Sequence, residues 1–212
     1  MRRLPVYLLL DTSGSMRGEP IESVKGGLQA LVASLRRDPQ ALESVHLAIV
    51  TFDRDVTVQV PLTPMEQFQL PDFSTPDSGP THLGLALEKL CALVDSEVIR
   101  SSEESKGDWR PLLFVMTDGS ASDSAKFKMM VPEVRKRGFG IIVACAAGPK
   151  AKKAELQPLA DQVVELETLD SSGFERFFEW VSASVAMGNK SMGTSSQVLL
   201  PPPPDDVKPT VL

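Results

Sequence analysis

The sequence is poor in the residues that build covalent or metal cross-links. Its 212 residues include only two cysteines, Cys91 and Cys145, and only two histidines. Two cysteines cannot make a four-cysteine zinc site, and both stand in apolar segments typical of a protein core. We therefore expect two free thiols in a reducing compartment.

The chain also lacks an excess of basic residues. It has 22 Lys and Arg against 28 Asp and Glu, which gives a net charge of −6. A binder of nucleic acid or of an anionic membrane normally presents a basic face. The charge balance therefore argues against both classes of partner.

Long hydrophobic runs are missing as well. The apolar run after the basic N-terminus, 4–10, contains Pro5 and ends at Asp11. It is too short for a membrane-spanning helix and is not followed by the small residues of a signal-peptide cleavage site. The expected location is the cytoplasm.

Short apolar segments instead alternate with amphipathic ones, in a chain that is 42% hydrophobic and 24% charged. Strands are expected at 6–10, 46–52, 56–60, 112–117, 139–146 and 163–166. Helices are expected at about 21–35, 83–98, 125–137, 152–159 and 172–185, with Pro132 breaking or kinking the third. The segment 61–80 holds five prolines and is expected to be a surface loop.

This order predicts an α/β fold with a doubly wound, mostly parallel six-stranded sheet and helices on both faces. One edge strand should be antiparallel, because only Asp53–Asp55 separate two of the strands and a parallel crossover needs a dozen residues. Periodicity stops at Met187. The prediction is a domain over 1–186 and a Pro-rich C-terminal tail over 187–212, either extended or disordered.

Oxygen-bearing side chains gather where two predicted strands end. The first strand runs into Asp11, Ser13 and Ser15, and the fourth ends at Asp118. In a doubly wound sheet, neighbouring strands place such residues in one crevice, to which Thr81 before a helix could add a hydroxyl. Carboxylates and hydroxyls suit a hard divalent cation, Mg²⁺ in the first place and Mn²⁺ or Ca²⁺ otherwise.

This pattern resembles the von Willebrand factor A (vWA) domain and its metal-ion-dependent adhesion site (MIDAS). The resemblance covers roughly residues 4–186 and rests on Asp11-x-Ser13-x-Ser15, Thr81 and Asp118. It implies a Rossmann-like vWA fold and a bound divalent cation. It also implies a protein partner that offers an Asp or Glu carboxylate, and no catalytic activity.

Three stretches also resemble the bacterial tellurite-resistance members of that family. They are RRLPVYLLLDTSGSMRGEPIESVKGGLQAL, GDWRPLLFVMTDG and VACAAG. The resemblance implies a cytoplasmic role in a tellurite-resistance or stress-response system, with a kinase or phosphatase of the same system as partner.

Three alternatives stay open at this stage. Asp11 could be the nucleophile of a Mg²⁺-dependent phosphatase, although such enzymes usually carry a second Asp where this chain has Ser13. The site could also buffer metal without a partner. Finally, Asp11 and Asp118 could only cap turns or helices, and Asp123 could either orient a metal-bound water or cap the helix that follows it.

Overall fold

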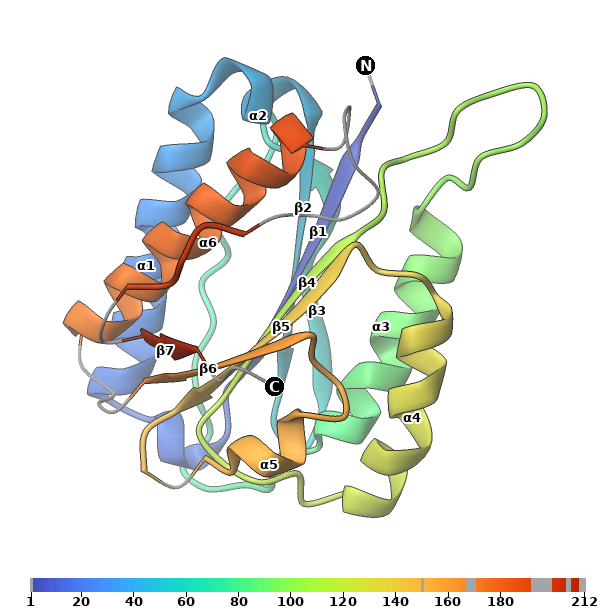
Figure 1. Cartoon of the computed structure of the whole chain (residues 1–212). Helices are drawn as coiled ribbons and strands as arrows, with labels where there is room; N and C mark the ends of the chain where they lie inside the picture. The colour runs from blue at the N-terminus through green and yellow to red at the C-terminus, as the bar shows by residue number, and fades with distance from the viewer. Residues whose placement is uncertain (1, 150, 167–170, 192–199, 205–206, 210–212) are drawn as a thin grey trace.

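The apolar runs form the strands of one central sheet, which the computed structural model places between two layers of helices (Figure 1). The structure describes the chain except residues 1, 150, 167–170, 192–199, 205–206 and 210–212. The strand order is β3-β2-β1-β4-β5-β6-β7. The strands are β1 (Leu4–Asp11), β2 (Val45–Phe52), β3 (Val56–Pro64), β4 (Leu112–Thr117), β5 (Ile141–Ala147), β6 (Gln162–Leu166) and β7 (Val207–Pro209).

Two hydrophobic cores hold the helices against the faces of the sheet. One face is covered by α1, α2 and α6, and the other by α3, α4 and α5 (Figure 1). The helices are α1 (Glu19–Arg37), α2 (Pro39–Ser44), α3 (Leu83–Glu97), α4 (Ser124–Lys136), α5 (Lys153–Leu156) and α6 (Ser171–Ser191), with a 3₁₀ turn η1 (Gly14–Met16) after β1. Every residue of β1 and β4 is buried, as expected for central strands with helices on both faces.

The predicted doubly wound architecture is confirmed. β1 pairs in parallel with β2 and β4, and β5 pairs in parallel with β4 and β6, while β3 is the expected antiparallel edge strand. The parallel strands therefore end at a common edge of the sheet, the lower edge in Figure 1, where η1 and the N-termini of α3 and α4 also lie. The two cysteines are free and buried, also as expected.

The tail adds a strand that the sequence did not indicate. β7 pairs antiparallel with β6, so the sheet has seven strands and a second antiparallel edge. Before β7, the indole N–H of Trp180 donates to the carbonyl of Pro201 at 2.9 Å, and Leu200 packs against the core beneath α6. The boundary predicted after residue 186 stays a prediction, and α6 itself continues to Ser191.

Two prolines lie within or at the start of helices. Of the predicted break or kink at Pro132, the break does not occur, because α4 runs from Ser124 to Lys136 as one helix. Pro132 is exposed, so water can bind the carbonyl that its missing N–H leaves without a partner. Pro39 is the first residue of α2, whose first turn is capped by the Asp38 carboxylate.

Finally, none of the helices in the described part of the chain has the length and apolar character needed to cross a membrane.

Candidate metal site

Asp11 is fixed by its own turn and by the neighbouring strand. It is the last residue of β1 and is only 1% exposed. Its Oδ1 accepts the backbone N–H of Ser13 at 2.8 Å, and its Oδ2 accepts the hydroxyl of Thr117 at 2.6 Å. The carboxylate is therefore held from two sides at the end of the central strand.

The turn after β1 carries the two serines toward β4. Met16 is fully buried and anchors η1 to the core, which holds the short turn against the sheet. The hydroxyl oxygens of Ser13 and Ser15 lie 3.2 Å apart, and Ser15 donates to Oδ1 of Asp118 at 2.9 Å. Ser13 and Asp118 are buried, whereas Ser15 is exposed, so the cluster opens to solvent at Ser15.

Thr81 joins the cluster through its backbone. Its N–H donates to the hydroxyl of Ser122 at 3.0 Å, and its carbonyl accepts the N–H of Ser122 at 2.8 Å. A Cβ atom on Gly119 would lie 3.8 Å from the Thr81 hydroxyl oxygen, so that hydroxyl stands over the turn that follows Asp118. The structure therefore brings all five predicted residues to one edge, four of them within a continuous chain of hydrogen bonds.

The buried position of Asp11 disfavours its charged form. The pKa of this carboxyl is raised to about 6, chiefly by burial and to a lesser extent by the nearby Asp118, although the hydrogen bonds from Ser13 and Thr117 act in the opposite direction. Among the described residues, no Lys or Arg forms an ion pair with Asp11. A cation at this position would relieve the cost of keeping Asp11 ionised.

The donor set fits a hard cation only if the hydroxyls take part. Over the residues that the structure describes, no group of three or more His, Cys, Asp or Glu side chains is arranged to hold a metal ion. Here two carboxylates stand with the hydroxyls of Ser13, Ser15 and Thr81, all oxygen donors of the kind that Mg²⁺ or Mn²⁺ prefers.

Of the two predicted roles of Asp123, the cap of the following helix is wrong. Its carboxylate does not cap α4, which begins at the next residue, but accepts the N–H groups of Gly84 at 3.0 Å and Leu85 at 2.8 Å in α3. Gly84 allows this arrangement, because a Cβ there would lie 2.4 Å from the backbone nitrogen of Phe127. Asp123 thus links the starts of α3 and α4 next to Thr81.

The sequence pattern does not reveal the supporting roles of two further residues. The Thr117 hydroxyl faces Asp11 only because β1 and β4 are neighbours, and Ser122 reaches Thr81 only because α3 and α4 start side by side. The two histidines are not part of the cluster. His82 lies at the start of α3 with Nδ1 2.8 Å from the carbonyl of Arg54, and His46 lies in β2.

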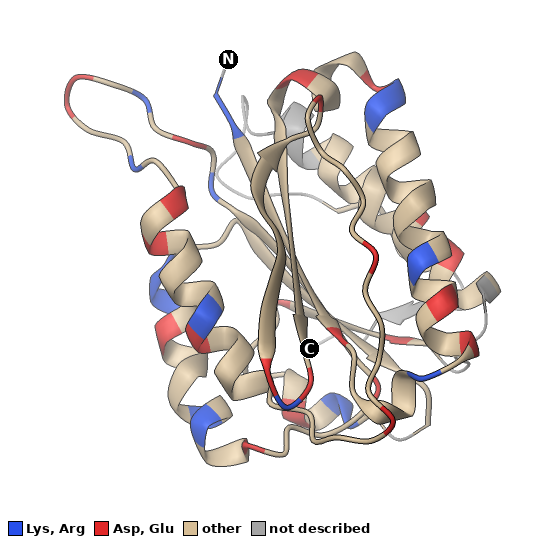
Figure 2. Cartoon of the chain, turned by 180° about the vertical axis from the view of Figure 1, so that it is seen from behind, with Lys and Arg blue, Asp and Glu red and all other residues tan. Residues whose placement is uncertain are grey.

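The rim of the cluster includes the long loop between β3 and α3. This loop runs between the β2–β3 hairpin and α1 (Figure 2), and Lys25 of α1 pairs with Asp72 at 3.1 Å. At its far end a Cβ on Gly14 would lie 2.7 Å from the Cα of Ser78, so the loop touches the turn between Ser13 and Ser15. Arg17 and Asp77 form an exposed ion pair there.

A model of the von Willebrand factor type A domain matches residues 6–175. The chain belongs to this family. A comparison with curated proteins gives no match.

Solved structures with a similar fold include three proteins at low sequence identity. Proximal thread matrix protein 1 from the mussel byssus, described with a zinc-occupied MIDAS motif, is 19% identical with a TM-score of 0.64, over 87% of this chain and 48% of that one. A von Willebrand factor type A protein from Catenulispora acidiphila is 17% identical with a TM-score of 0.64, over 88% of this chain and 43% of that one.

The pilus adhesin SpaC from Lactobacillus rhamnosus GG is 10% identical with a TM-score of 0.69, over 88% of this chain and 31% of that one. This chain therefore spans less than half the length of each of these three proteins. At these identities the likeness concerns the vWA fold alone.

Proposed function

We propose that this vWA domain is a metal-dependent protein-interaction module. Asp11, Ser13, Ser15, Thr81 and Asp118 would hold a divalent cation, and a partner's Asp or Glu carboxylate would complete its coordination. The observation that carries the proposal is the hydrogen-bonded chain from Ser13 through Ser15 to Asp118, which ends beside the buried Asp11.

The charge of the cluster favours a carboxylate from outside. Two aspartates neutralise a divalent ion, and the three hydroxyls add no charge. A cation with so few anionic ligands remains attractive to a further acid, and the exposed Ser15 lies on the side from which that acid can approach. Mg²⁺ is the proposed ion, with Mn²⁺ or Ca²⁺ as alternatives. The zinc in the MIDAS motif of the mussel protein supports a divalent cation in general.

The chemistry of the cluster favours binding over catalysis. A phosphatase that used Asp11 as nucleophile would need a general acid near it, and position 13 holds a serine, whose hydroxyl is a poor acid at neutral pH. We therefore propose no enzymatic activity.

The cellular system is proposed on sequence resemblance alone. The stretches around Asp11, Asp118 and Cys145 resemble the bacterial tellurite-resistance protein TerY. On that basis we propose a cytoplasmic stress-response role, with a kinase or phosphatase of the same system as the partner that offers the carboxylate.

Calorimetric titration of Mg²⁺ and Mn²⁺ into the metal-free protein tests the site. We expect binding in the wild type and none in Asp11→Ala or Asp118→Ala. Asp55→Ala is the matched control, because Asp55 is an exposed aspartate in the β2–β3 turn at the same edge. Unchanged affinity in the Asp11 or Asp118 variant would refute the metal site.

A pull-down from the source cell, with and without EDTA, tests the partner. We expect a protein that is retained by the wild type and by Asp55→Ala in Mg²⁺, and that is lost with EDTA or with Asp118→Ala. A partner that binds equally well in all four conditions would contradict metal-dependent recognition.

A further inference from the structure

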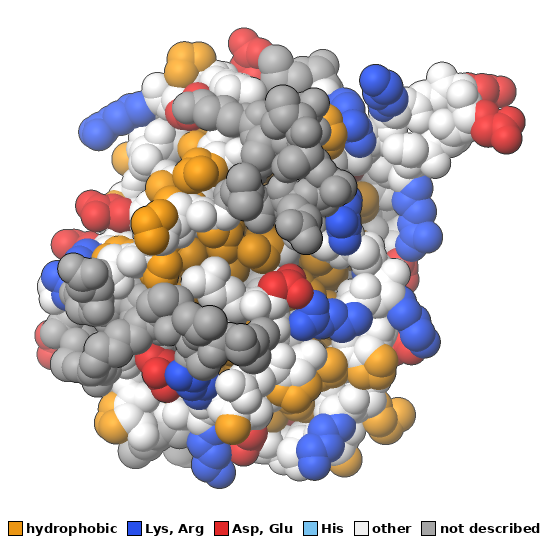
Figure 3. Space-filling model, viewed as in Figure 1, with side chains coloured by type: hydrophobic (Ala, Val, Ile, Leu, Met, Phe, Trp, Pro, Cys, Tyr) orange, Lys and Arg blue, Asp and Glu red, His pale blue; other side chains and the backbone are white. Residues whose placement is uncertain are grey.

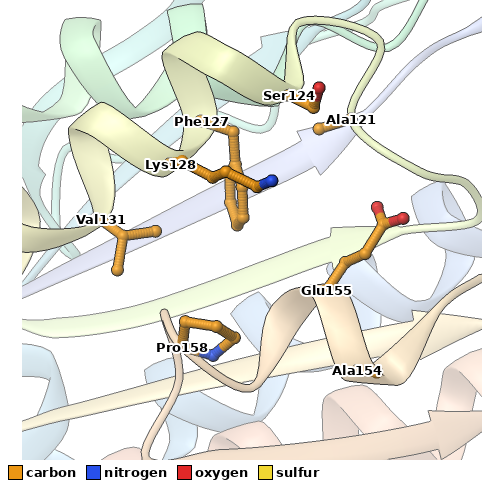
Figure 4. Close-up of a pocket in the computed structure, with 8 residues that line it drawn as sticks. All are labelled: Ala121, Ser124, Phe127, Lys128, Val131, Ala154, Glu155 and Pro158. Carbon is orange, nitrogen blue, oxygen red and sulfur yellow. The ribbon is translucent and has the colours of Figure 1, made fainter.

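A pocket of about 450 Å³ lies between α4 and α5, next to the candidate metal site. Its wall is mostly apolar and includes Phe127, Val131 and Pro158, which Figure 4 shows around one open space. Figure 3 shows apolar side chains gathered over this part of the surface. The volume is ample for one large apolar side chain, since cavities near 150 Å³ can already hold benzene.

The pocket and the metal site share one loop. Ala121 lines the pocket, and it follows Asp118 by three residues, so their Cα atoms are at most about 11 Å apart. The same loop contains Ser122, which holds Thr81 in place. One short peptide segment can therefore reach both Asp118 and the pocket.

The charges at the mouth suit an acidic segment. Lys128 of α4 and Glu155 of α5 face the same space (Figure 4), and Glu155 already pairs with Lys152 at 3.5 Å. Lys128 has no acidic partner among the ion pairs of the described residues. Its ammonium is thus available to attract the acidic ligand that the metal site requires.

From these observations we infer that the pocket binds an apolar side chain of the same partner segment that supplies the carboxylate. This inference rests on the proposed function. The recognised chemistry is a peptide with an Asp or Glu and, nearby, a Leu, Met or Phe. An extended peptide advances about 3.3 Å per residue, so the two side chains should be roughly two to five residues apart.

The probe is a set of synthetic peptides in a Gly-Ser background. One peptide carries a single Glu, and the others add a Phe at increasing distances from it. Binding is followed by methyl NMR of the alanines and valines, which include Ala121 and Val131 at the pocket. In Mg²⁺ we expect one spacing to bind about tenfold more tightly than the Glu-only peptide and to shift those methyl signals.

Two variants separate the pocket from the rest of the surface. Ala154→Trp fills the mouth from an exposed position on α5, and Ala92→Trp makes the same change at an exposed position on α3. The gain in peptide affinity that Phe provides should disappear in Ala154→Trp and persist in Ala92→Trp. The Glu-only peptide should bind both variants equally.

The outcomes distinguish this inference from the proposed function. If the Glu-only peptide binds with metal but Phe adds nothing at any spacing, the pocket assignment is wrong and the metal site stands. If Phe peptides bind equally with EDTA and are lost in Ala154→Trp, the pocket stands and the metal function fails. If no peptide binds, both fail. Self-association abolished by Ala154→Trp would assign the pocket to a second copy and overturn the inference.

Discussion

The hydroxyl of Thr117 at the end of β4 donates to Oδ2 of Asp11 at the end of β1, at a distance of 2.6 Å. The two residues are 106 positions apart in the chain, and the parallel pairing of β1 with β4 brings them together. Thr117 is fully buried, so no water can replace its hydroxyl. This contact fixes the orientation of the carboxylate on which the proposed metal site depends.

Replacing Thr117 by valine should weaken the site and the fold together. The near-isosteric change removes one buried hydrogen bond, for a loss of about 1–2 kcal/mol in the free energy of unfolding. Because outer partners orient metal ligands, Mg²⁺ affinity should fall by about tenfold or more. Urea unfolding and calorimetry measure the two effects. Thr51→Val is the control, since the hydroxyl of the buried Thr51 accepts from Gln59 of β3 at 2.9 Å rather than bonding to Asp11, and it should leave metal affinity unchanged.

Asp11→Asn should stabilise the metal-free domain at neutral pH. The folded-state pKa of about 6 lies above the ordinary 3.8, so ionised Asp11 disfavours folding at pH above 6, and this cost disappears as the pH falls below about 4. The difference corresponds to at most about 3 kcal/mol. In EDTA, the stability gain of Asp11→Asn should therefore be largest above pH 6 and vanish near pH 4. A gain that is independent of pH would show that ionisation of Asp11 is not its cause.

Removing the Asp123 carboxylate should loosen the start of α3. Asp123→Ala leaves the N–H groups of Gly84 and Leu85 without their acceptor, and loss of a helix cap typically costs about 1 kcal/mol. Asp38→Ala removes a comparable cap from α2, far from the metal site. Both variants should lower the melting temperature by similar amounts, but only Asp123→Ala should reduce Mg²⁺ affinity, because Thr81 lies two residues before the start of α3. Equal Mg²⁺ affinity in the two variants would show that Asp123 does not support the metal site.

Two glycines should respond to alanine in opposite directions. At Gly84 a Cβ would lie 2.4 Å from the backbone nitrogen of Phe127, so α3 and α4 would have to separate, and we expect a loss of about 2 kcal/mol or more. At Gly26 in α1 a Cβ meets nothing within 4 Å, and the higher helix propensity of alanine should add about 0.5–1 kcal/mol. Denaturant unfolding measures both. A stabilised Gly84→Ala would contradict the close packing of α3 on α4.

The sequence predicts those parts of the molecule that depend on local pattern. The apolar runs that end at Asp11 and Asp118 identify central strands, and the rule for sites in doubly wound sheets then places both aspartates at one edge. The role of Asp123 is not predictable in this way. A capping residue usually serves its own helix, and only the packing of α3 against α4 shows that Asp123 serves the other one.

The hydrophobic pattern of the sequence also fails to predict elements that are stabilised by tertiary contacts. β7 has three residues and follows a run of prolines, so no periodicity marks it, and it forms because the edge of β6 offers hydrogen-bond partners. Pro132 was expected to disrupt α4, yet packing of α4 against α3 retains the helix while Pro132 faces solvent.

The pairing of β7 with β6 has a consequence for how copies of the domain can meet. An uncovered edge strand is a template for pairing with another chain, and here β7 covers the edge of β6 with a segment of the same chain. The opposite edge strand, β3, contains Pro61 and Pro64, which have no N–H to donate to an incoming strand. β7 is then the outermost strand on its side, but it is only three residues long and ends at Pro209. Both margins of the sheet are therefore poorly suited to pairing with another chain, which leaves the loop-bearing end of the strands as the natural surface for recognition.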